Sequence, residues 1–188
     1  MMSILTILTT NPEKQRVAKA VFAQSNIAIE FVAFETPEIQ AYTCEEVAIA
    51  SAAFAYEKFL KPVAVTDAGY FIKALNGFPG PFLKYVNTML SPEEIVRMME
   101  GKSDRQIDLL ETVVYMDDQR KPLVFTSTVR GTLALKPRGK GRLFDQLFVP
   151  DGYTQTAGEL GMDKMSEIYV ERFTHWRRLE EFLAVPSR

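Results

Sequence analysis

Basic and polar residues follow an apolar segment near the N-terminus, in positions suited to phosphate chemistry. Thr9 and Asn11 stand where a β-branched run ends, and Pro12-Glu13-Lys14 then opens a helix-like segment. Exposed N–H groups and the dipole at a helix N-terminus attract anions, and Lys14 in the first turn adds a positive charge. A capped helix with a solvated Lys14 explains the same residues and is the commoner arrangement.

Two acidic residues are candidates for metal binding. Asp67 is expected at the C-terminal end of a short buried strand, 63–66, before the flexible pair Ala68-Gly69. Ligands of open α/β folds gather at the carboxyl ends of strands, and a carboxylate there can bind metal or activate water. Glu38 is the second candidate, because Mg²⁺ typically takes one or two carboxylates and fills its other positions with phosphate oxygens and waters. A helix or turn cap is the alternative role for Asp67.

Two later segments and one histidine offer further chemistry. The basic glycine loop 136–142 could face a polyphosphate, but a solvated turn is the expected role. The pair Phe144-Asp145 could stack on a base and accept a hydrogen bond from a ring N–H, although an edge strand and turn over 144–152 explain it equally well. The single histidine, His175, is expected in a structural or solvent-facing role. The sequence has no P-loop, G-x-S-x-G or Cys/His pair, which argues against a Ser or Cys nucleophile.

The pattern around these residues predicts an α/β fold with a mixed sheet. Strands are predicted at 4–10, 27–34, 63–66, 109–116 and 123–135, and the last two form a hairpin across 117–121. Helices are predicted after Asn11, from a capping box of Thr43 and Glu46 to about Leu60, from Ser91 to Gly101, and over 163–184. The segment 77–81 is predicted to be a loop.

The composition narrows the classes of protein. With 188 residues, 47% of them hydrophobic, and a net charge of −2, the chain suits one domain, 1–188, with room for two lobes, and no general polyanion-binding surface. Cys44 is the only cysteine, so an internal disulfide and a cysteine-based zinc cluster are excluded. The apolar N-terminus is too short for a signal peptide, and no apolar run approaches the roughly 20 residues of a membrane span. We therefore expect a cytoplasmic protein without nucleic-acid or membrane partners.

In order along the chain, these motifs resemble the inosine triphosphate pyrophosphatase family, the non-standard purine nucleoside triphosphate (XTP/dITP) pyrophosphatases. The resemblance covers nearly the whole chain. The matching residues are Thr9, Asn11 and Lys14 (T-x-N-x-x-K), Pro37-Glu38, Asp67-Ala68-Gly69, Gly77-Phe78-Pro79-Gly80 with Lys84, Pro137-Arg138-Gly139, Phe144-Asp145, Pro150-Asp151-Gly152, and Thr156, Glu159-Leu160 and Lys164 (T-x-x-E-L…K).

The resemblance implies a fold, a reaction and a set of roles. The fold would be an elongated mixed sheet flanked by helices, in two lobes around a central cleft, in a homodimer. Independently of the resemblance, the segment 78–85 is apolar enough to form an interface. The reaction would be Mg²⁺-dependent hydrolysis of a nucleoside triphosphate to a monophosphate and pyrophosphate, which cleanses the nucleotide pool. By the same resemblance, Glu38 and Asp67 would bind the metal, and Asp67 would also polarise the attacking water. The substrate-binding residues would be Thr9, Asn11, Lys14, Ala68, Lys84, Phe144, Asp145 and Lys164.

The sequence departs from the family pattern in three places. The family's aromatic-Gly-aromatic-Asp-Pro is replaced by Arg142-Leu143-Phe144-Asp145-Gln146. Its Ser-His-Arg after the C-terminal lysine is absent at the usual spacing, and Thr174-His175-Trp176-Arg177 stands further on, where the predicted helix continues. The usual lysine is missing from 48–53. Since the first two features bear on base recognition in the family, we expect retained hydrolysis with altered or relaxed base choice, on modified or pyrimidine nucleotides for example. A nucleotide-binding protein with weakened turnover is the alternative.

Overall fold

The computed structural model describes residues 4–37 and 39–185. Strands and helices alternate in its first half, as the sequence predicts. The elements are β1 (Ile4–Leu8), α1 (Pro12–Phe22), β2 (Ala28–Val32), α2 (Cys44–Phe59), β3 (Val63–Ile72), β4 (Phe78–Gly80), α3 (Leu83–Met89), α4 (Pro92–Met98), β5 (Gln106–Met116), β6 (Leu123–Leu133), β7 (Phe148–Pro150), α5 (Ala157–Arg172) and α6 (His175–Ala184), with short 3₁₀ turns at Lys73–Leu75 and Phe144–Gln146.

The strands form one seven-stranded mixed sheet, which confirms the predicted α/β class. Its order is β2-β1-β3-β5-β6-β7, with β4 paired to β3. β1 is parallel to both β2 and β3, whereas the pairs β3–β4 and β6–β7 are antiparallel. The helix-containing connections between β1, β2 and β3 are what parallel pairing requires.

The chain divides into two compact units. Unit 1 takes in Met1–Asp67, Glu111–Ser127 and Phe173–Arg188, apart from the residues not described, and unit 2 takes in Ala68–Leu110 and Thr128–Arg172. Strands β3, β5 and β6 each contribute residues to both units. The predicted pair of lobes therefore has a counterpart in these units.

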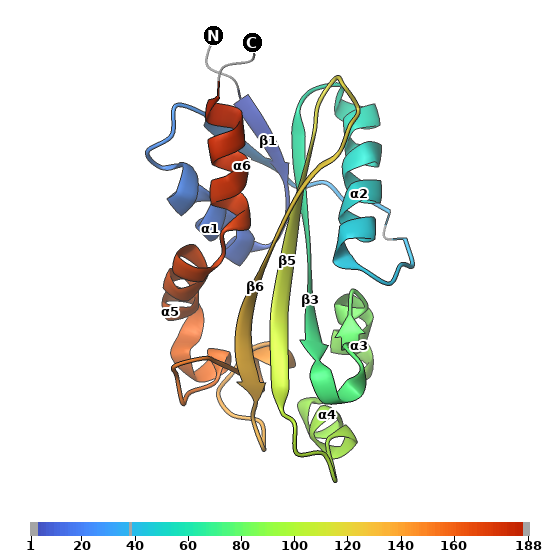
Figure 1. Ribbon diagram of the computed structural model, residues 1–188, viewed down its shortest axis with the longest axis vertical. Coiled ribbons are helices and arrows are strands. Elements are labelled where there is room, and N and C mark those ends of the chain that lie inside the picture. The colour runs from blue at the N-terminus through green and yellow to red at the C-terminus, as the bar shows by residue number, and fades with distance from the viewer. Residues whose placement is uncertain (1–3, 38, 186–188) are drawn as a thin grey trace. The chain divides into compact units, whose positions relative to one another are not determined.

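In unit 1, helices cover both faces of the sheet (Figure 1). Helix α2 packs on one face through an apolar cluster that includes Ala52, Val63, Val65 and Val114. Helices α1 and α6 lie on the other face, where the rings of Phe22 and Trp176 meet edge to face at 6.3 Å between centroids. Because side chains alternate along a strand, this packing assigns each position of β3 and β5 to one face.

Side-chain caps begin the predicted helices. Asn11 Oδ1 accepts a hydrogen bond from the Glu13 N–H at 2.9 Å, with Pro12 in the first turn of α1. Capping boxes at Thr43 and at Ser91 start α2 and α4. These local patterns satisfy N–H groups that no helical carbonyl can reach, which is why the sequence predicted these helix starts correctly.

Unit 2 is built around the ends of β3, β5 and β6 that it contains. The ring of Tyr70 stacks on Phe144 at 4.7 Å and meets Phe148 at 5.3 Å, between centroids. The start of α5 is fixed to the basic loop, because Thr156 Oγ1 donates to the Arg138 carbonyl at 2.9 Å and Arg138 pairs with Glu159 at 3.6 Å. The loop is therefore more than the solvated turn that the sequence predicted.

Two predictions around β3 are wrong. The strand does not end at Thr66: β3 continues through Asp67, Ala68 and Gly69 to Ile72. The segment 77–81 is not simply a loop, since Phe78–Gly80 forms β4 against Tyr70–Ile72. The β-forming run Tyr70-Phe71-Ile72 pairs with β4 and extends the strand beyond the Ala-Gly pair that resembled a turn.

The predicted C-terminal helix over 163–184 is two helices. α5 ends at Arg172 and α6 begins at His175, with Thr174 at the N-cap position, and α5 is itself kinked at Gly161, where φ is 77°. The sequence predicts one apolar face formed by Met165, Tyr169, Phe173, Trp176, Leu179 and Leu183; the first five are buried, and Leu183 is partly buried. The helical spacing of these residues continues across the break between α5 and α6, so the sequence pattern does not reveal the break.

Other boundaries shift without changing the elements. β1 and β2 are shorter than predicted, β5 starts earlier, β6 ends at Leu133, and α3 was not predicted. Within the described ranges, no helix combines the length and the hydropathy that a membrane span requires.

Candidate functional site

The first part of the candidate site is the middle of β3, where Thr66 and Asp67 point to opposite faces of the sheet. Val63 and Val65 pack against α2, so Asp67 lies on the α2 face and Thr66 on the face of α1 and α6. The Asp67 carboxylate lies beside Cys44, the first residue of α2. Burial raises the pKa of the Cys44 thiol, and the negative charge and hydrogen bonding of Asp67 raise it further.

Lys14 reaches this strand from the first turn of α1. Its Nζ donates a hydrogen bond to the backbone carbonyl of Thr66 at 3.3 Å. The ammonium charge contributes to the lowered pKa of Glu111, and it opposes only in part the rise in the pKa of Cys44. Thr9 and Asn11, also predicted for substrate binding, have local partners: Thr9 Oγ1 accepts from the Asn11 N–H at 3.1 Å, and Asn11 caps α1.

Glu111 is a buried carboxylate on β5 that sequence reasoning missed. The residue is 7% exposed. Glu111 and Val114 are three positions apart on β5, so their side chains point to opposite faces of the sheet. Val114 packs towards α2, and Glu111 therefore faces α1 and α6. Burial raises the pKa of Glu111, but the charge of Lys14 and the neighbouring His175 and Thr66 side chains together outweigh burial, and its pKa lies below the usual range.

His175, the first residue of α6, is fully buried beside Glu111. Its Nδ1 lies 2.6 Å from Oγ of Ser127 on β6, and its Nε2 lies 3.6 Å from Oε1 of Glu111. The ring also meets Phe173 edge to face at 5.0 Å. The prediction of a solvent-facing histidine is wrong, and the structural alternative is confirmed.

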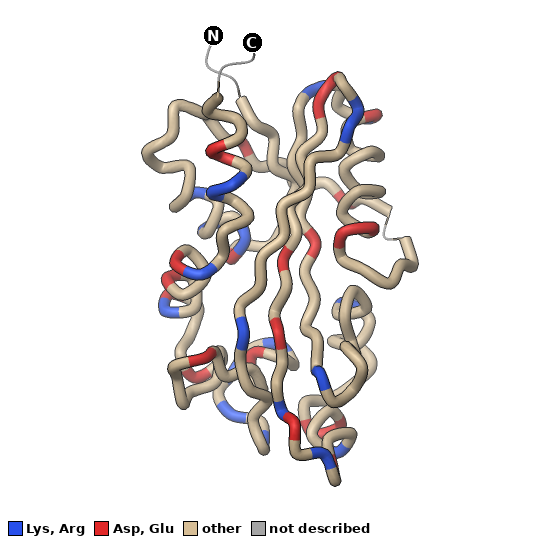
Figure 2. The backbone as a smooth tube through the Cα atoms, viewed as in Figure 1, with Lys and Arg blue, Asp and Glu red and all other residues tan. Residues whose placement is uncertain are grey.

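The sequence did contain a feature that could have identified Glu111: a charged residue inside a buried strand. Figure 2 shows acidic residues on the central strands, where β3 carries Asp67 and β5 carries Glu111. In the sequence, Glu111 and Thr112 interrupt an otherwise apolar run from Leu109 to Met116. A charged residue inside a buried strand needs a partner, which makes it a site candidate.

The other predicted residues lie in unit 2 and are described there by themselves. Lys84 is exposed on α3. Lys164 is exposed on α5, and its Nζ contacts Glu167 Oε2 at 2.7 Å, a hydrogen bond that raises the pKa of Lys164. Ala68 follows Asp67 within β3. Glu38 lies outside the described residues.

The predicted aromatic-acid pair is largely enclosed within unit 2. Phe144 is 1% exposed and stacks on Tyr70, so a base could reach its ring only after these side chains move. Asp145 Oδ2 accepts a hydrogen bond from the Arg142 N–H at 2.8 Å. Burial raises the pKa of Asp145, against the lowering effect of that hydrogen bond. Both residues hold the loop in the structure.

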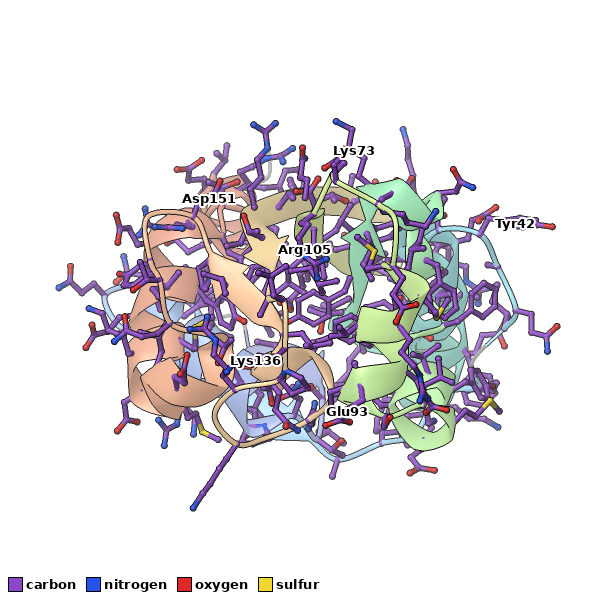
Figure 3. The ribbon with its side chains drawn as sticks, turned by 90° about the horizontal axis from the view of Figure 1, so that it is seen from below. Tyr42, Lys73, Glu93, Arg105, Lys136 and Asp151 are labelled. Carbon is purple, nitrogen blue, oxygen red and sulfur yellow. The ribbon has the colours of Figure 1, made fainter. Side chains whose placement is uncertain are left out.

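A polar hollow of about 580 Å³ in unit 2 includes Arg105 and Asp151 in its lining (Figure 3). The Arg105 guanidinium donates to the carbonyls of Leu133 and Ala134 at 2.7 and 2.8 Å. These bonds fix the end of β6, and they commit much of the hydrogen-bonding capacity of Arg105 to the backbone. The position of Arg105 in this hollow is therefore explained by its bonds to the backbone.

Comparison with known proteins identifies the family. The Ham1 family model matches residues 5–178. The chain belongs to the Ham1 family. Its relatives include the dITP/XTP pyrophosphatase of Methanopyrus kandleri, 37% identical over 89% of this chain and 93% of that protein. The dITP/XTP pyrophosphatase of Thermococcus kodakarensis is 30% identical over 92% of this chain and 96% of that protein. The resemblance found in the sequence is thus confirmed.

Solved structures of Ham1 proteins share the fold. The HAM1 protein of Coxiella burnetii has a TM-score of 0.80 over 97% of this chain and 98% of that protein, at 23% identity. The Ham1 protein of Staphylococcus aureus has a TM-score of 0.79 over 96% and 98%, also at 23% identity. The predicted α/β architecture is therefore that of the Ham1 family.

Proposed function

We propose that this Ham1-family chain is a hydrolase of non-standard purine nucleoside triphosphates, which releases the monophosphate and pyrophosphate and so cleanses the nucleotide pool. The observation that carries the proposal is the Lys14 ammonium bound to the Thr66 carbonyl, immediately before the Asp67 carboxylate on β3. A cation for phosphate oxygens and a carboxylate for metal or water are the groups that this hydrolysis needs. The activity in the names of the relatives points the same way.

The residues fit a bound Mg²⁺. Carboxylate oxygen is the ligand that Mg²⁺ prefers, and it takes one or two carboxylates with substrate phosphates and waters in the other positions. Asp67 on β3 and Glu38, which lies outside the described residues, would hold it. The ion would neutralise phosphate charge during the reaction.

The chain's own groups perform the other steps. Lys14 binds triphosphate oxygens by charge, and the positive end of the α1 helix dipole favours the same anion. Asp67 orients the attacking water and accepts its proton, so that the water attacks the α-phosphorus and pyrophosphate leaves. In this scheme Lys84 and Lys164 contact phosphate or sugar, and Ala68 and Asp145 lie at the nucleoside. Phe144 stacks on the base once the side chains that cover its ring have moved.

Base choice is proposed to be altered or relaxed. The family's Ser-His-Arg is absent at its usual spacing, and the nearby His175 is buried against Ser127 and Glu111. Discrimination that depends on hydrogen bonds to the base falls when those partners are absent. An enzyme with a strict site for non-standard purines hydrolyses ITP, XTP and dITP much faster than other nucleotides. For this protein we expect a smaller difference between those rates and the rates for modified or standard nucleotides.

The test is pyrophosphate release from a panel of nucleoside triphosphates with Mg²⁺, with and without chelator. Asp67→Asn should lower kcat by about 10²-fold or more, because a positioned general base contributes roughly that much. Asp117→Asn, in the β5–β6 turn, is the matched control and should retain the wild-type rate. No release from any triphosphate, with binding intact, would favour the alternative of a nucleotide-binding protein.

We further propose a cytoplasmic homodimer without nucleic-acid or membrane partners. Phe82, Tyr85 and Met89, at and within α3, expose 38%, 43% and 72% of their surface, and apolar exposure of this kind is typical of an interface. Light scattering after gel filtration should give twice the 21.3 kDa of the chain. Tyr85→Lys should yield the monomer, whereas Tyr42→Lys, at another exposed tyrosine, should not.

A further inference from the structure

Four polar residues of unit 1, Ser127, His175, Glu111 and Lys14, lie on four different elements, and two of them, Glu111 and His175, are buried. The Ser127 hydroxyl on β6 meets His175 on α6, and His175 contacts Glu111 on β5. Glu111 and the side chain of Thr66, the residue whose carbonyl binds Lys14, face α1 and α6 from the neighbouring strands β5 and β3. Ser127 and His175 are 48 residues apart in the sequence, and their side chains meet at 2.6 Å. The reaction scheme above uses Lys14 and none of the other three.

The burial of Glu111 means that its carboxylate depends on its neighbours. Removing a carboxylate from water is costly unless it is paired, so Glu111 would destabilise the fold without its cationic and polar neighbours. The Glu111 side chain is 10% exposed and that of His175 is 0% exposed. Their facing atoms, Oε1 and Nε2, have no hydrogen-bond partner in the described structure apart from their own long contact of 3.6 Å.

The hydrogen bond at Ser127 decides how the imidazole faces Glu111. When the Ser127 hydroxyl donates to Nδ1, the ring proton sits on Nε2 and points at the Glu111 carboxylate. The ring is held in place by Phe173 and Trp176, at 5.0 and 5.7 Å between centroids. Ser127 thus orients the His175 ring towards the Glu111 carboxylate.

We propose that Glu111 is a positioning residue for Lys14, and that His175 and Ser127 act through Glu111. The Lys14 side chain is flexible, and its one backbone hydrogen bond, to Thr66, is 3.3 Å long. A second, buried counter-charge restricts the ammonium to the region beside β3, where the scheme needs it. Lys14 then meets the triphosphate already oriented, which reduces the conformational entropy lost on binding.

The inference rests on the proposed role of Lys14 at the triphosphate, and binding of inorganic tripolyphosphate tests it without hydrolysis. Isothermal titration calorimetry in Mg²⁺ should show Kd for tripolyphosphate at least fivefold weaker in Glu111→Gln than in the wild type. In a Lys14→Met background, the same Glu111→Gln change should alter Kd less than twofold. Such non-additivity identifies residues that act through one another.

Ser127→Ala provides a second variant in case Glu111→Gln does not fold, and it should follow the same pattern with a smaller change. Thr112→Val is the matched control: it breaks the Thr112–Thr126 contact of 2.9 Å between the same two strands, on the other face of the sheet, and should leave Kd unchanged. With nucleotide substrate, Glu111→Gln should raise KM more than it lowers kcat.

The possible outcomes separate the inference from the function. Additive effects of Glu111→Gln and Lys14→Met, tighter tripolyphosphate binding in Glu111→Gln, or no binding by the wild type would each overturn the inference. Coupled effects on binding, with no pyrophosphate released from any nucleotide, would support the inference and reject the proposed hydrolysis. A change that differed between bases would overturn it as well, because a positioning residue at the phosphate affects all bases alike.

Discussion

The Nζ of Lys14 lies 3.3 Å from the backbone carbonyl oxygen of Thr66, 52 residues further along the chain. This hydrogen bond connects the first turn of α1 to the middle of β3, one residue before Asp67. A lysine at a helix N-terminus is usually solvated, and here it is tied to the strand that carries the candidate catalytic carboxylate. The consequences of this contact can be measured.

Replacing Lys14 by methionine should weaken triphosphate binding while the fold is kept. The change removes the charge and keeps most of the side chain, so KM should rise by roughly tenfold, the effect of about 1.4 kcal/mol. Steady-state kinetics over the nucleotide panel gives the value. Lys19→Met, on the same helix but over the ring of Phe31, should leave KM as it is. Equal losses in the two variants would contradict a specific role for Lys14.

Acid should destabilise the protein partly through Glu111. Its pKa is lowered in the folded state, so the unfolded chain binds more protons, and the stability from Glu111 is present above its unfolded pKa of about 4.3 and lost as the pH falls towards the lower, folded pKa. Thermal melts between pH 6 and pH 3 should therefore decline less steeply for Glu111→Gln than for the wild type. If the melting temperatures of the two proteins fell in parallel, Lys14 and His175 would not stabilise the Glu111 carboxylate.

The Cys44 thiol should be inert in the folded protein. It is 1% exposed, burial raises its pKa, and the neighbouring Asp67 carboxylate adds to the increase, so the reactive thiolate is scarce at neutral pH. A disulfide reagent at pH 8 should react with about one thiol per chain in denaturant and with almost none without it. Rapid labelling of the native protein would contradict this environment.

The close approach of the basic loop to the start of α5 makes Gly158 sensitive to substitution. A Cβ there would overlap the Lys140 carbonyl oxygen, which belongs to rigid backbone. Gly158→Ala should lower the free energy of unfolding by about 1–3 kcal/mol, measured by denaturant titration. Gly101→Asn is the comparison, because its position has φ of +74° with open space around it and asparagine tolerates that backbone conformation.

The sequence predicted those parts of the fold that local chemistry controls. Asn11, Thr43 and Ser91 start helices because their side chains satisfy nearby N–H groups, and this requires no knowledge of distant residues. The extent of β3 was missed because Ala68-Gly69 has the composition of a turn, whereas pairing with β4 keeps it extended. Tertiary pairing of this kind overrides local propensity.

The candidate site was predicted in part. Lys14 and Asp67 are motif residues and lie on or against one strand, but the sequence gives no sign that Ser127 meets His175, because their contact depends on how α6 packs on β5 and β6. The break before His175 was hidden by apolar spacing that continues from Met165 to Leu179. The roles of Lys84, Phe144, Asp145 and Lys164 stay predictions.

The division of the chain into units also sets an order for its synthesis. Everything that unit 2 contains has been translated once Arg172 is made, whereas unit 1 still lacks α6, with His175 and Trp176. Growing chains leave the ribosome at about 5–20 residues per second and begin to fold as they emerge. During that interval α6 does not yet cover the face of β5 that carries Glu111. A chaperone that binds exposed apolar strands could bind to that face.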